Sequence, residues 1–546
     1  MPGRMRIALI VDGPSVARWQ ADALLQLAAD ADFILLTCTN TRFTRRPFRH
    51  GLYYLLNLIS LKGAATRPAP LPARLHIVER LDFEAEWDGA WQSFPRQVLD
   101  LLASERPDAA IKFGMGLLRV PDELECRILS YHHGDPRKFR GRPAGFYELL
   151  ADVPTVGQIV QIISNRLDAG AILAFAETRV QPHSYRATMA EAYRASPLLM
   201  RTAVRNVLSG KVLPIEPSGR NYRLPSNATV LRFGAKLLAG KIRRLAYGAF
   251  FEKAWEVASA KADAHSPEQL AGAIGQSSSW RVVARPAMYR FLADPFPHPD
   301  GGVLVEALRR SDGQGEIVHF AEGSEQILCS GPGHFSYPAT IEAGGERFML
   351  PEVSEWTRPR LYRLTPHGCE PAADLNVEGG RRLVDATLYS GDDGLYLFAN
   401  DVADGSEVLR LWTADSLFSR FTDHPDSPVR ISPAGGRMGG GLLELGGRLY
   451  RPGQDCSRGY GRRILLFEVL ALSRSSYDER PAGEISLEDA IGPHTLNVRG
   501  GTAWFDLYRE RFSLLAGFRR FRASVSKRRA LGASRQAGSE AVQPAR

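Results

Sequence analysis

The pattern of hydrophobic and polar positions divides the chain into two parts of different character. In the first part, short apolar runs alternate with segments in which apolar residues recur at helical spacing. The predicted strands lie at 6–11, 33–39, 76–81 and 109–115, and the predicted helices lie at 17–30 and 94–107. Strands that alternate with helices need crossover connections, and these favour a mainly parallel sheet. We therefore expect a Rossmann-like α/β domain over residues 1–212.

From about residue 279 the pattern becomes one of short strands separated by turns. The predicted strands are 301–308, 315–323, 346–352, 360–364, 394–400, 408–414, 447–453, 463–472 and 502–510. Turn sequences such as DGQG and GDDG separate them, which is typical of an all-β module. Because radial repetition of small sheets protects their edges, we expect a small β-propeller over residues 279–511. A pair of packed sheets is the alternative, because the sequence shows no strict repeat.

Two further segments differ from both predicted domains. Residues 213–278 include a long stretch of helical period with a basic face, which predicts a helical connector. Residues 512–546 are basic and polar, which predicts a disordered tail. The chain is therefore expected to be multidomain.

Basic residues are interleaved with leucine and tyrosine at roughly helical spacing over residues 41–63 and 234–251. Segments of this kind can lie on an anionic lipid surface, so we expect weak peripheral membrane contact as one interpretation. The other interpretation is that both segments pack on the domains and leave their charges in water. No RNP or helix-turn-helix signature accompanies them, and no specific nucleic-acid partner is expected.

Composition changes this picture little. The 546 residues are 44% hydrophobic and carry a formal net charge of +9, but many basic residues crowd into 509–529. The five cysteines show no CxxC spacing, which argues against a disulfide framework or a zinc site and predicts a reducing compartment. The first apolar run is too short for a signal peptide, and no stretch approaches the ~20 apolar residues of a transmembrane helix. We expect a cytoplasmic protein without a metal site.

Polar residues gather where the strand predicted at 109–115 is followed by the next one. The chain reads SYHHGDPRKFRG from residue 130 and SNRLDAGAIL from residue 164. Parallel sheets bind ligands beyond the carboxyl ends of their strands, which is where these residues fall. No GxGxxG or GxxxxGK follows the first strand, which excludes dinucleotide and P-loop sites. The candidate site residues are Ser130, His132, His133, Asp135 and Asp168.

The motifs PDAAIKFGMGLL, SYHH, RKFRG and VGQIVQIISNRLDAGAIL also carry a family resemblance. Residues 5–212 resemble the fold of methionyl-tRNA, glycinamide ribonucleotide and nucleotide-aminosugar formyltransferases. The resemblance implies that His132 acts as base and electrophile and that Asp168 orients it or relays its proton. Arg140 and Gly170 keep the family pattern, and His133 and Asp135 add to the polar cluster. The implied cofactor is 10-formyltetrahydrofolate.

Ser130 stands where this family has an asparagine. Its hydroxyl offers one donor where an amide offers two, and the loss of an oxyanion donor costs on the order of 10²-fold to 10³-fold in rate. We interpret Ser130 as the replacement donor. One alternative is that His132 and Asp168 only stabilise the fold. Another is a hydrolase triad of Ser130, His132 and Asp168, although the GxSxG elbow is absent.

The β module carries a second resemblance. The motifs FLADPFPH, GHFSYPAT, MLPEVSEW, VDATLY, LYRPGQDCSRGYG and HTLN resemble the propeller domain at the N-terminus of plant glucosamine inositolphosphorylceramide transferases, itself similar to five-bladed glycosidases. The resemblance implies carboxylates in a central funnel at Asp294, Glu352 and Asp385. Sugar-hydroxyl contacts are implied at Arg437, Gln454, Asp455 and Tyr460. The order Asp, Glu, Asp differs from the Asp, Asp, Glu of the hydrolases, so glycan binding is favoured over hydrolysis.

Each motif of the β module also has a simpler explanation, since Asp and Pro near strand ends form turns. Taken together, the two resemblances predict an enzyme that moves a formyl or related acyl group from a folate donor to an amino sugar of a nucleotide sugar or glycan. The propeller would hold the sugar. The alternatives are a non-catalytic glycan-binding scaffold in polysaccharide assembly and a propeller glycosidase.

Overall fold

The computed structural model describes residues 4–40, 47–166, 169–331, 333–353 and 355–521. The chain forms two compact units, Met1–Lys241 and Ile242–Arg546. The division falls inside the segment predicted as a connector. Among the described helices, none combines the length and the apolar character needed to cross a bilayer.

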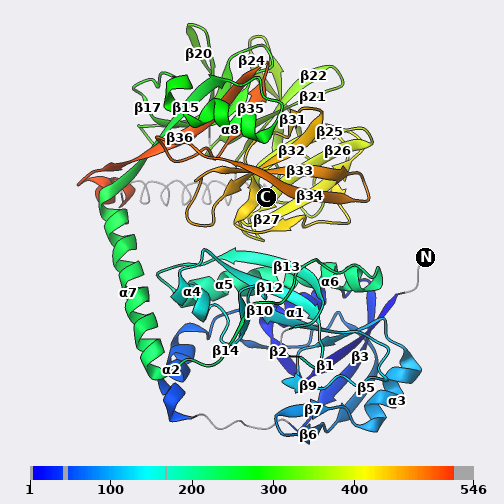
Figure 1. Ribbon diagram of the computed structural model, residues 1–546. Helices are drawn as coiled ribbons and strands as arrows, with labels where there is room; N and C mark the ends of the chain where they lie inside the picture. The colour runs from blue at the N-terminus through cyan, green and yellow to red at the C-terminus, as the bar shows by residue number, and fades with distance from the viewer. Residues whose placement is uncertain (1–3, 41–46, 167–168, 332, 354, 522–546) are drawn as a thin grey trace, which may run out of the picture. The chain divides into compact units, whose positions relative to one another are not determined.

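The first unit is built on a mixed seven-stranded sheet with the strand order β13-β12-β10-β8-β1-β3-β5 (Figure 1). The strands are β1 (Met5–Val11), β3 (Ala31–Cys38), β5 (His76–Phe83), β8 (Ala109–Lys112), β10 (Ile128–His133), β12 (Thr155–Ile162) and β13 (Ile172–Arg179). The first five of these run parallel, while β12 is antiparallel to β10 and to β13. The alternation of strands and helices therefore predicted the sheet correctly at β1, β3, β5 and β8.

Helices and short strands complete the first unit. The helices are α1 (Arg18–Leu25), α2 (Gly51–Ser60), α3 (Arg96–Glu105), α4 (Phe146–Ala151), α5 (Tyr185–Ala195), α6 (Leu199–Leu208) and α7 (Asn227–Phe250), with 3-10 turns η1 (Phe48–His50) and η2 (Ser196–Leu198). The short strands are β2 (Ser15–Ala17), β4 (Pro68–Pro70), β6 (Glu86–Asp88), β7 (Trp91–Ser93), β9 (Leu117–Leu118), β11 (Phe139–Gly141) and β14 (Arg220–Tyr222). The apolar face of α3 buries Val98 and Leu102 in one core with β1, β3 and β8. The beginning of α7 buries Val230 and Phe233 in a second core with α4 and α5.

The second unit consists of antiparallel sheets (Figure 1). Four of them follow one another along the chain, in the orders β17-β18-β19-β20, β21-β22-β23-β24, β25-β26-β27-β28 and β30-β32-β33-β34, with β29 and β31 paired to β27 and β32. A fifth sheet, β16-β15-β36-β35, joins strands from both ends of the unit. Over the described residues, none of these sheets closes on itself.

Nine strands of the second unit match the predicted runs closely. The strands of this unit are β15 (Phe251–Lys261), β16 (Arg281–Val282), β17 (Tyr289–Pro297), β18 (Val303–Arg309), β19 (Gly315–Ala321), β20 (Ser324–Cys329), β21 (Ser336–Ala343), β22 (Glu346–Glu352), β23 (Arg360–Thr365), β24 (Gly368–Asp374), β25 (Leu383–Gly391), β26 (Gly394–Asp401), β27 (Val408–Ala414), β28 (Thr422–Asp423), β29 (Arg430–Ile431), β30 (Ala434–Met438), β31 (Leu443–Leu445), β32 (Arg448–Asp455), β33 (Ile464–Leu472), β34 (Tyr477–Ile485), β35 (Leu496–Arg499) and β36 (Thr502–Phe512). The helical elements are α8 (Pro267–Gly275) and η3 (Ser277–Ser279). All nine predicted strands are present, because their alternating apolar positions face buried cores.

The predicted connector differs from the structure in its second half. Residues 251–261 form strand β15, which pairs along its whole length with β36. Trp255 and Val257 are buried while Glu256 between them is not, which is a strand pattern. The sequence interpretation extended the helical period of the preceding segment, now helix α7, across these residues. Most of the predicted tail, 522–546, and residues 41–46 of the predicted basic segment lie outside the described residues.

The two predicted membrane-contact segments each place apolar side chains at the surface. Within α2, Leu55, Leu58 and Ile59 are exposed, and within α7 Leu238 and Leu245 are exposed. Apolar surface of this kind is compatible with lipid contact and with protein contact. Peripheral membrane contact stays a prediction.

Candidate functional site

The first strands of three successive sheets in the second unit each carry one polar residue at a corresponding position. Asp294 on β17, Tyr337 on β21 and Asp385 on β25 have left-handed backbone conformations, with φ of 50°, 43° and 51°. Each lies at a register shift in the first strand of its sheet. A bulge re-aims a side chain, and a non-glycine residue in this conformation costs about 1–3 kcal/mol. Each of these three sheets therefore holds one polar residue in a strained backbone conformation at a register shift.

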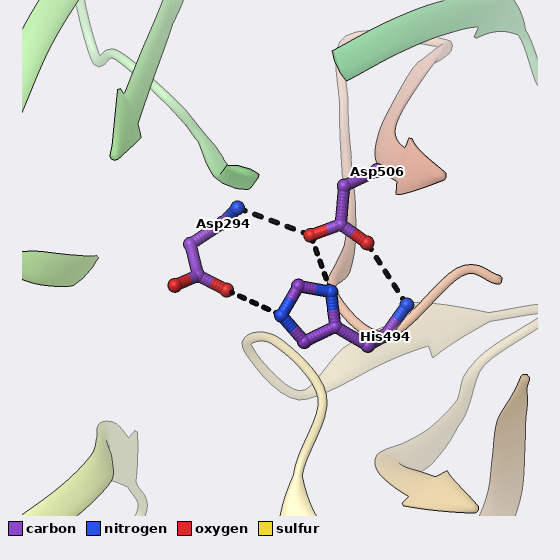
Figure 2. Close-up of side chains that lie close together, drawn as sticks. All are labelled: Asp294, His494 and Asp506. Atoms are coloured by element: carbon purple, nitrogen blue, oxygen red, sulfur yellow. Dashed lines mark hydrogen bonds and ion pairs between the residues drawn. The ribbon is translucent and has the colours of Figure 1, made fainter. Parts of the chain in front are cut away.

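Asp294 belongs to a buried row of three ionisable side chains, shown in Figure 2. His494 lies between two carboxylates, with Nε2 3.1 Å from Asp294 Oδ1 and Nδ1 2.7 Å from Asp506 Oδ2. Asp506 is fully buried and also accepts backbone N–H bonds from His494 and Asp294, at 2.9 and 3.0 Å. The Asp294 carboxylate is held further by the Thr495 hydroxyl at 2.8 Å.

The charges of this row follow from its geometry. Burial by itself would lower the pKa of His494, but the two adjacent carboxylates outweigh it and hold that pKa well above its usual value. Burial by itself would raise the pKa of Asp294, but His494 outweighs it and lowers that pKa. We infer a protonated imidazole that bridges the carboxyl groups of Asp294 and Asp506. It ties β17 to β36 and to the segment just before β35.

The same three residues form a group that could hold a metal ion, because one ligand atom from each lies within 4.8 Å of the others. One imidazole and two carboxylates would suit several divalent cations. Each ring nitrogen of His494 already lies close to a carboxylate oxygen, however, and a protonated ring forms an ion pair with both carboxylates, although Nδ1 has no hydrogen bond of regular geometry. The two ion pairs of His494 therefore account for the close approach of these three side chains without a metal ion.

A second cluster lies around Asp385. Its Oδ2 accepts hydrogen bonds from Arg437 Nε at 2.5 Å and from Gln454 Nε2 at 3.1 Å, and its backbone N–H donates to Glu352 Oε2 at 2.9 Å. Among the described residues, none donates to Asp385 Oδ1. The cluster thus brings together Glu352, Asp385, Arg437 and Gln454 from β22, β25, β30 and β32.

The pKa of Glu352 is strongly shifted in this cluster. Burial and the neighbouring Asp385 carboxylate raise its pKa well above the usual value, although Arg437 opposes the shift. A carboxyl group with a raised pKa stays protonated and can donate a hydrogen bond. The cluster therefore combines the Glu352 acid, the Asp385 carboxyl group and the Arg437 guanidinium, which can together donate to and accept from the hydroxyls of a sugar.

Tyr460 completes the second cluster with an aromatic ring. The ring is 39% exposed, and its centroid lies 5.3 Å from the Arg437 guanidinium and 5.2 Å from the His494 ring. Lys253 supports the same loop, since its Nζ donates to the Tyr460 carbonyl at 3.1 Å. Burial lowers the pKa of Lys253 to about 8. An exposed ring beside a charged cluster is a surface on which the apolar face of a sugar can stack.

Asp455, which the sequence grouped with these residues, has other partners. It accepts a hydrogen bond from Arg463 Nε at 2.8 Å, whereas the preceding Gln454 reaches Asp385. Successive residues of a strand point to opposite faces, so the two side chains of β32 separate. Asp455 makes no contact with the central cluster among the described residues.

In the first unit, a small cavity of about 90 Å³ lies at the carboxyl end of β8, beside the middle of β10. Its lining includes Lys112, Ser130, Gln161, Arg166 and Gly170. Gly170 is required by packing, because a Cβ there would lie 1.7 Å from the Ile162 carbonyl oxygen. The cavity falls where a parallel sheet usually binds its ligand.

The other residues predicted for this site have separate surroundings. His132 is buried, with Nε2 3.4 Å from the Phe139 carbonyl oxygen. His133 points to the opposite face of β10, where its Nε2 lies 2.9 Å from Ser196 Oγ, and burial lowers its pKa to about 3. Asp135 pairs with Arg137 at 2.8 Å, and Arg140 donates to the Gly219 carbonyl at 2.7 Å.

Asp168 lies outside the described residues, so its distance from His132 stays untested. The polar residues predicted as one site on β10 lie on both faces of this strand. Ser130 and His132 are two residues apart on this strand and share a face. The contacts of His133, Asp135 and Arg140 hold neighbouring segments together and do not reach the cavity.

Sequence reasoning missed several residues of the second unit. His494 and Thr495 lie in the HTLN motif, and Asp506 is the acid within the apolar run TAWFDLYRE. Tyr337 lies in SYPAT, where its backbone N–H faces Asp294 Oδ2 at 3.3 Å and its hydroxyl contacts Thr387 at 2.9 Å. The sequence could have pointed to Asp506, because an acid inside an apolar strand is expected to be buried and a buried carboxylate needs a partner.

Comparison with known proteins concerns mainly this second unit. Residues 326–497 match the family model described as glucosamine inositolphosphorylceramide transferase 1, N-terminal. The rice (Oryza sativa subsp. japonica) protein of that name is 31% identical over 258 residues, which are 42% of this chain and 33% of the relative. The Arabidopsis thaliana protein is 29% identical over 205 residues, which are 35% of this chain and 27% of the relative.

Similarity to solved structures is more distant. A formyltetrahydrofolate deformylase of Burkholderia mallei is 15% identical and has a TM-score of 0.26, with 38% of this chain and 66% of the other covered. A β-xylosidase, RS223, is 15% identical and has a TM-score of 0.30, with 36% and 77% covered. These scores are too low to carry an argument. The chain spans about a third of the length of its rice relative, and residues 326–497 are similar to the N-terminal family of the glucosamine inositolphosphorylceramide transferases.

Proposed function

We propose that the second unit is a five-bladed β-propeller that binds a sugar at the Asp385 cluster. Contacts between the edge strands support the ring of blades, since β17 contacts β21 and β35, β21 contacts β25, and β25 contacts β30. Leu496 on β35 donates to the Gly439 carbonyl, just after β30, at 2.7 Å. The sheet shared by β15 and β36 would close the ring with strands from both ends of the unit.

The observation that carries the sugar-binding proposal is the set of unused polar atoms around Asp385. Asp385 Oδ1 and the two terminal nitrogens of Arg437 have no hydrogen-bond partner among the described residues, although Asp385 Oδ2 and Arg437 Nε are paired. Glu352 is partly exposed and has a raised pKa. Sugar hydroxyls donate and accept, so they can satisfy all three groups. Tyr460 supplies the stacking surface.

An amino sugar is the ligand we propose. Its ammonium group can donate a hydrogen bond to Asp385 Oδ1, for which none of the described residues is a donor. The name of the plant relatives, glucosamine inositolphosphorylceramide transferase, supports the same substrate class. Binding of the sugar for transfer is favoured over hydrolysis, because the second carboxylate that hydrolysis would use, Asp294, is fixed by His494 and Thr495.

Glucosamine binding to the full chain tests this proposal by titration calorimetry. We expect a measurable heat, and we expect Tyr460→Ala to weaken the affinity roughly tenfold through loss of stacking. Phe418→Ala is the matched control, because Phe418 is an aromatic residue that is 59% exposed and does not contact the cluster. The absence of heat with the unchanged protein, or an equal loss in both variants, would contradict the proposal.

Formyl transfer at the first unit is a second candidate, favoured by the position of its cavity beside Ser130 and Gly170. The cavity of about 90 Å³ accommodates a one-carbon group but not the ring system of a folate, since ligand pockets usually measure about 300–1,000 Å³. No step is therefore derived through that cofactor. What the chain itself offers is the Ser130 hydroxyl as a donor and the His132 ring on the same face of β10.

Mass spectrometry of glucosamine incubated with 10-formyltetrahydrofolate tests this second candidate. If the first unit transfers formyl groups, the protein yields an N-formyl product, and Ser130→Ala lowers its rate on the order of 10²-fold. His132→Ala should lower it at least as much. His76→Ala is the control, because His76 is exposed on β5, away from the cavity. A lack of product from the unchanged protein excludes this activity with glucosamine.

A further inference from the structure

Two cysteines of the second unit lie side by side on neighbouring sheets. Cys329 ends β20 and Cys369 lies near the start of β24, and these are the outermost strands of the first two sheets. Their Sγ atoms are 3.0 Å apart, and no disulfide joins them. Cys329 is 5% exposed, while Cys369 is partly exposed. A disulfide bond measures about 2.05 Å, so the sulfur atoms are within about 1 Å of bonding distance.

We propose that Cys329 and Cys369 form a reversible disulfide that joins the first two sheets of the second unit. The strands around them are already fixed relative to each other. Gln326 on β20 donates through Nε2 to the His367 carbonyl at 2.8 Å, just before β24. The Cys369 thiol also lies 3.1 Å from the Leu328 carbonyl oxygen. Closure of the bond therefore needs a small movement of two side chains and no rearrangement of the sheets.

The two cysteines differ in the role that each can take. A hydrogen bond from Cys329 lowers the pKa of Cys369, although burial opposes the shift. Cys369 is also the more exposed of the two, so it meets the oxidant first. Cys329 is buried beside it and can only react next.

A small disulfide such as oxidised glutathione is the oxidant. The Cys369 thiolate attacks one sulfur of this disulfide, its S–S bond breaks, and one glutathione leaves as a thiolate. Cys329 then gives up its proton to that thiolate or to water, and its sulfur attacks Cys369 Sγ. The second glutathione leaves. Two protein thiols have been oxidised, and one glutathione disulfide has been reduced to two thiols.

The proposed bond encloses a segment that carries part of the candidate site. The two cysteines are 40 positions apart, and the segment between them contains β21 and β22 with Tyr337 and Glu352. A cross-link over a loop of this length restricts the unfolded chain and stabilises the folded one. Oxidation should therefore stabilise the segment that presents Glu352. The cysteine spacing gave no sign of this pair, because β20 and β24 meet only in the folded unit.

The test uses the full chain equilibrated with oxidised or reduced glutathione. Free thiols are counted under denaturing conditions, peptides are mapped by mass spectrometry, and melting temperatures are compared. We expect two of the five thiols to be lost on oxidation, a peptide pair linked through Cys329 and Cys369, and a melting temperature higher by roughly 5–10 °C. Return to reduced glutathione should reverse all three changes.

Cys369→Ser should abolish the linked peptides and the thermal shift. Cys369→Ala is a second variant in case the hydroxyl is poorly tolerated at this position. Cys456→Ser is the matched control, because Cys456 is a buried cysteine that directly follows β32 of a different sheet, and it should keep both effects. Five free thiols after oxidation of the unchanged protein, or linked peptides from any other pair, would overturn the proposal.

Discussion

Replacing His494 by glutamine is expected to destabilise the second unit by about 3–5 kcal/mol. The reason is that Asp294 and Asp506 are 6% and 0% exposed, and the substitution leaves both of these buried carboxylates without their shared cation. Urea unfolding followed by the fluorescence of the buried tryptophans measures the change. His367→Gln is the control, because His367 is exposed and lies outside the row, and it should change stability by less than about 0.5 kcal/mol.

The pH dependence of unfolding separates this charge effect from a loss of packing. The pKa of His494 in the folded unit lies above its unfolded value of 6.5. The stability that His494 contributes is therefore complete below about pH 6.5 and is lost as the pH rises through the folded pKa. The difference between the unchanged protein and His494→Gln should shrink on the alkaline side. A difference that stays constant with pH would contradict an imidazolium at this position.

Arg437→Gln is expected to be nearly as damaging, with a loss of about 3–5 kcal/mol, whereas Glu352→Gln is expected to cost almost nothing. Arg437 is the cation beside Asp385, and the side chains of the two are only 15% and 5% exposed. Glu352 is already neutral when its pKa is raised, so a glutamine keeps its shape and can still accept the hydrogen bond from the Asp385 N–H. Urea unfolding of both variants at neutral pH makes the comparison.

The raised pKa of Glu352 also predicts a pH profile. The proton on this group favours the folded state, so its contribution is fully present below the unfolded pKa of 4.5 and is lost as the pH rises through the raised value. Glu352→Gln should remove this loss and be as stable as the unchanged protein, or more stable, at neutral pH. Equal destabilisation by Glu352→Gln and Arg437→Gln would show that Glu352 is ionised in the folded protein.

The chemistry of the first unit was predicted less completely than its sheet. Apolar runs of strand length located β1, β3 and β8, because residues buried on both faces of a sheet leave a continuous signal in the sequence. The predicted β5 is also present, although most of its residues are exposed. The candidate site depends instead on which face of β10 each residue takes. That placement put Ser130 beside the cavity and turned His133 toward Ser196.

In the second unit, the sequence by itself determined nine of the strands and named Asp294, Glu352, Asp385, Arg437, Gln454 and Tyr460. Local alternation and turn residues are sufficient for strands, because both act over a few neighbouring positions. Only the tertiary structure decided that Asp294 and Asp506 flank His494, that Asp455 turns away to Arg463, and that Cys329 meets Cys369. The first and the last of these pairings join residues from different sheets, and they involve buried charges and sulfur atoms that approach one another only after the sheets have packed.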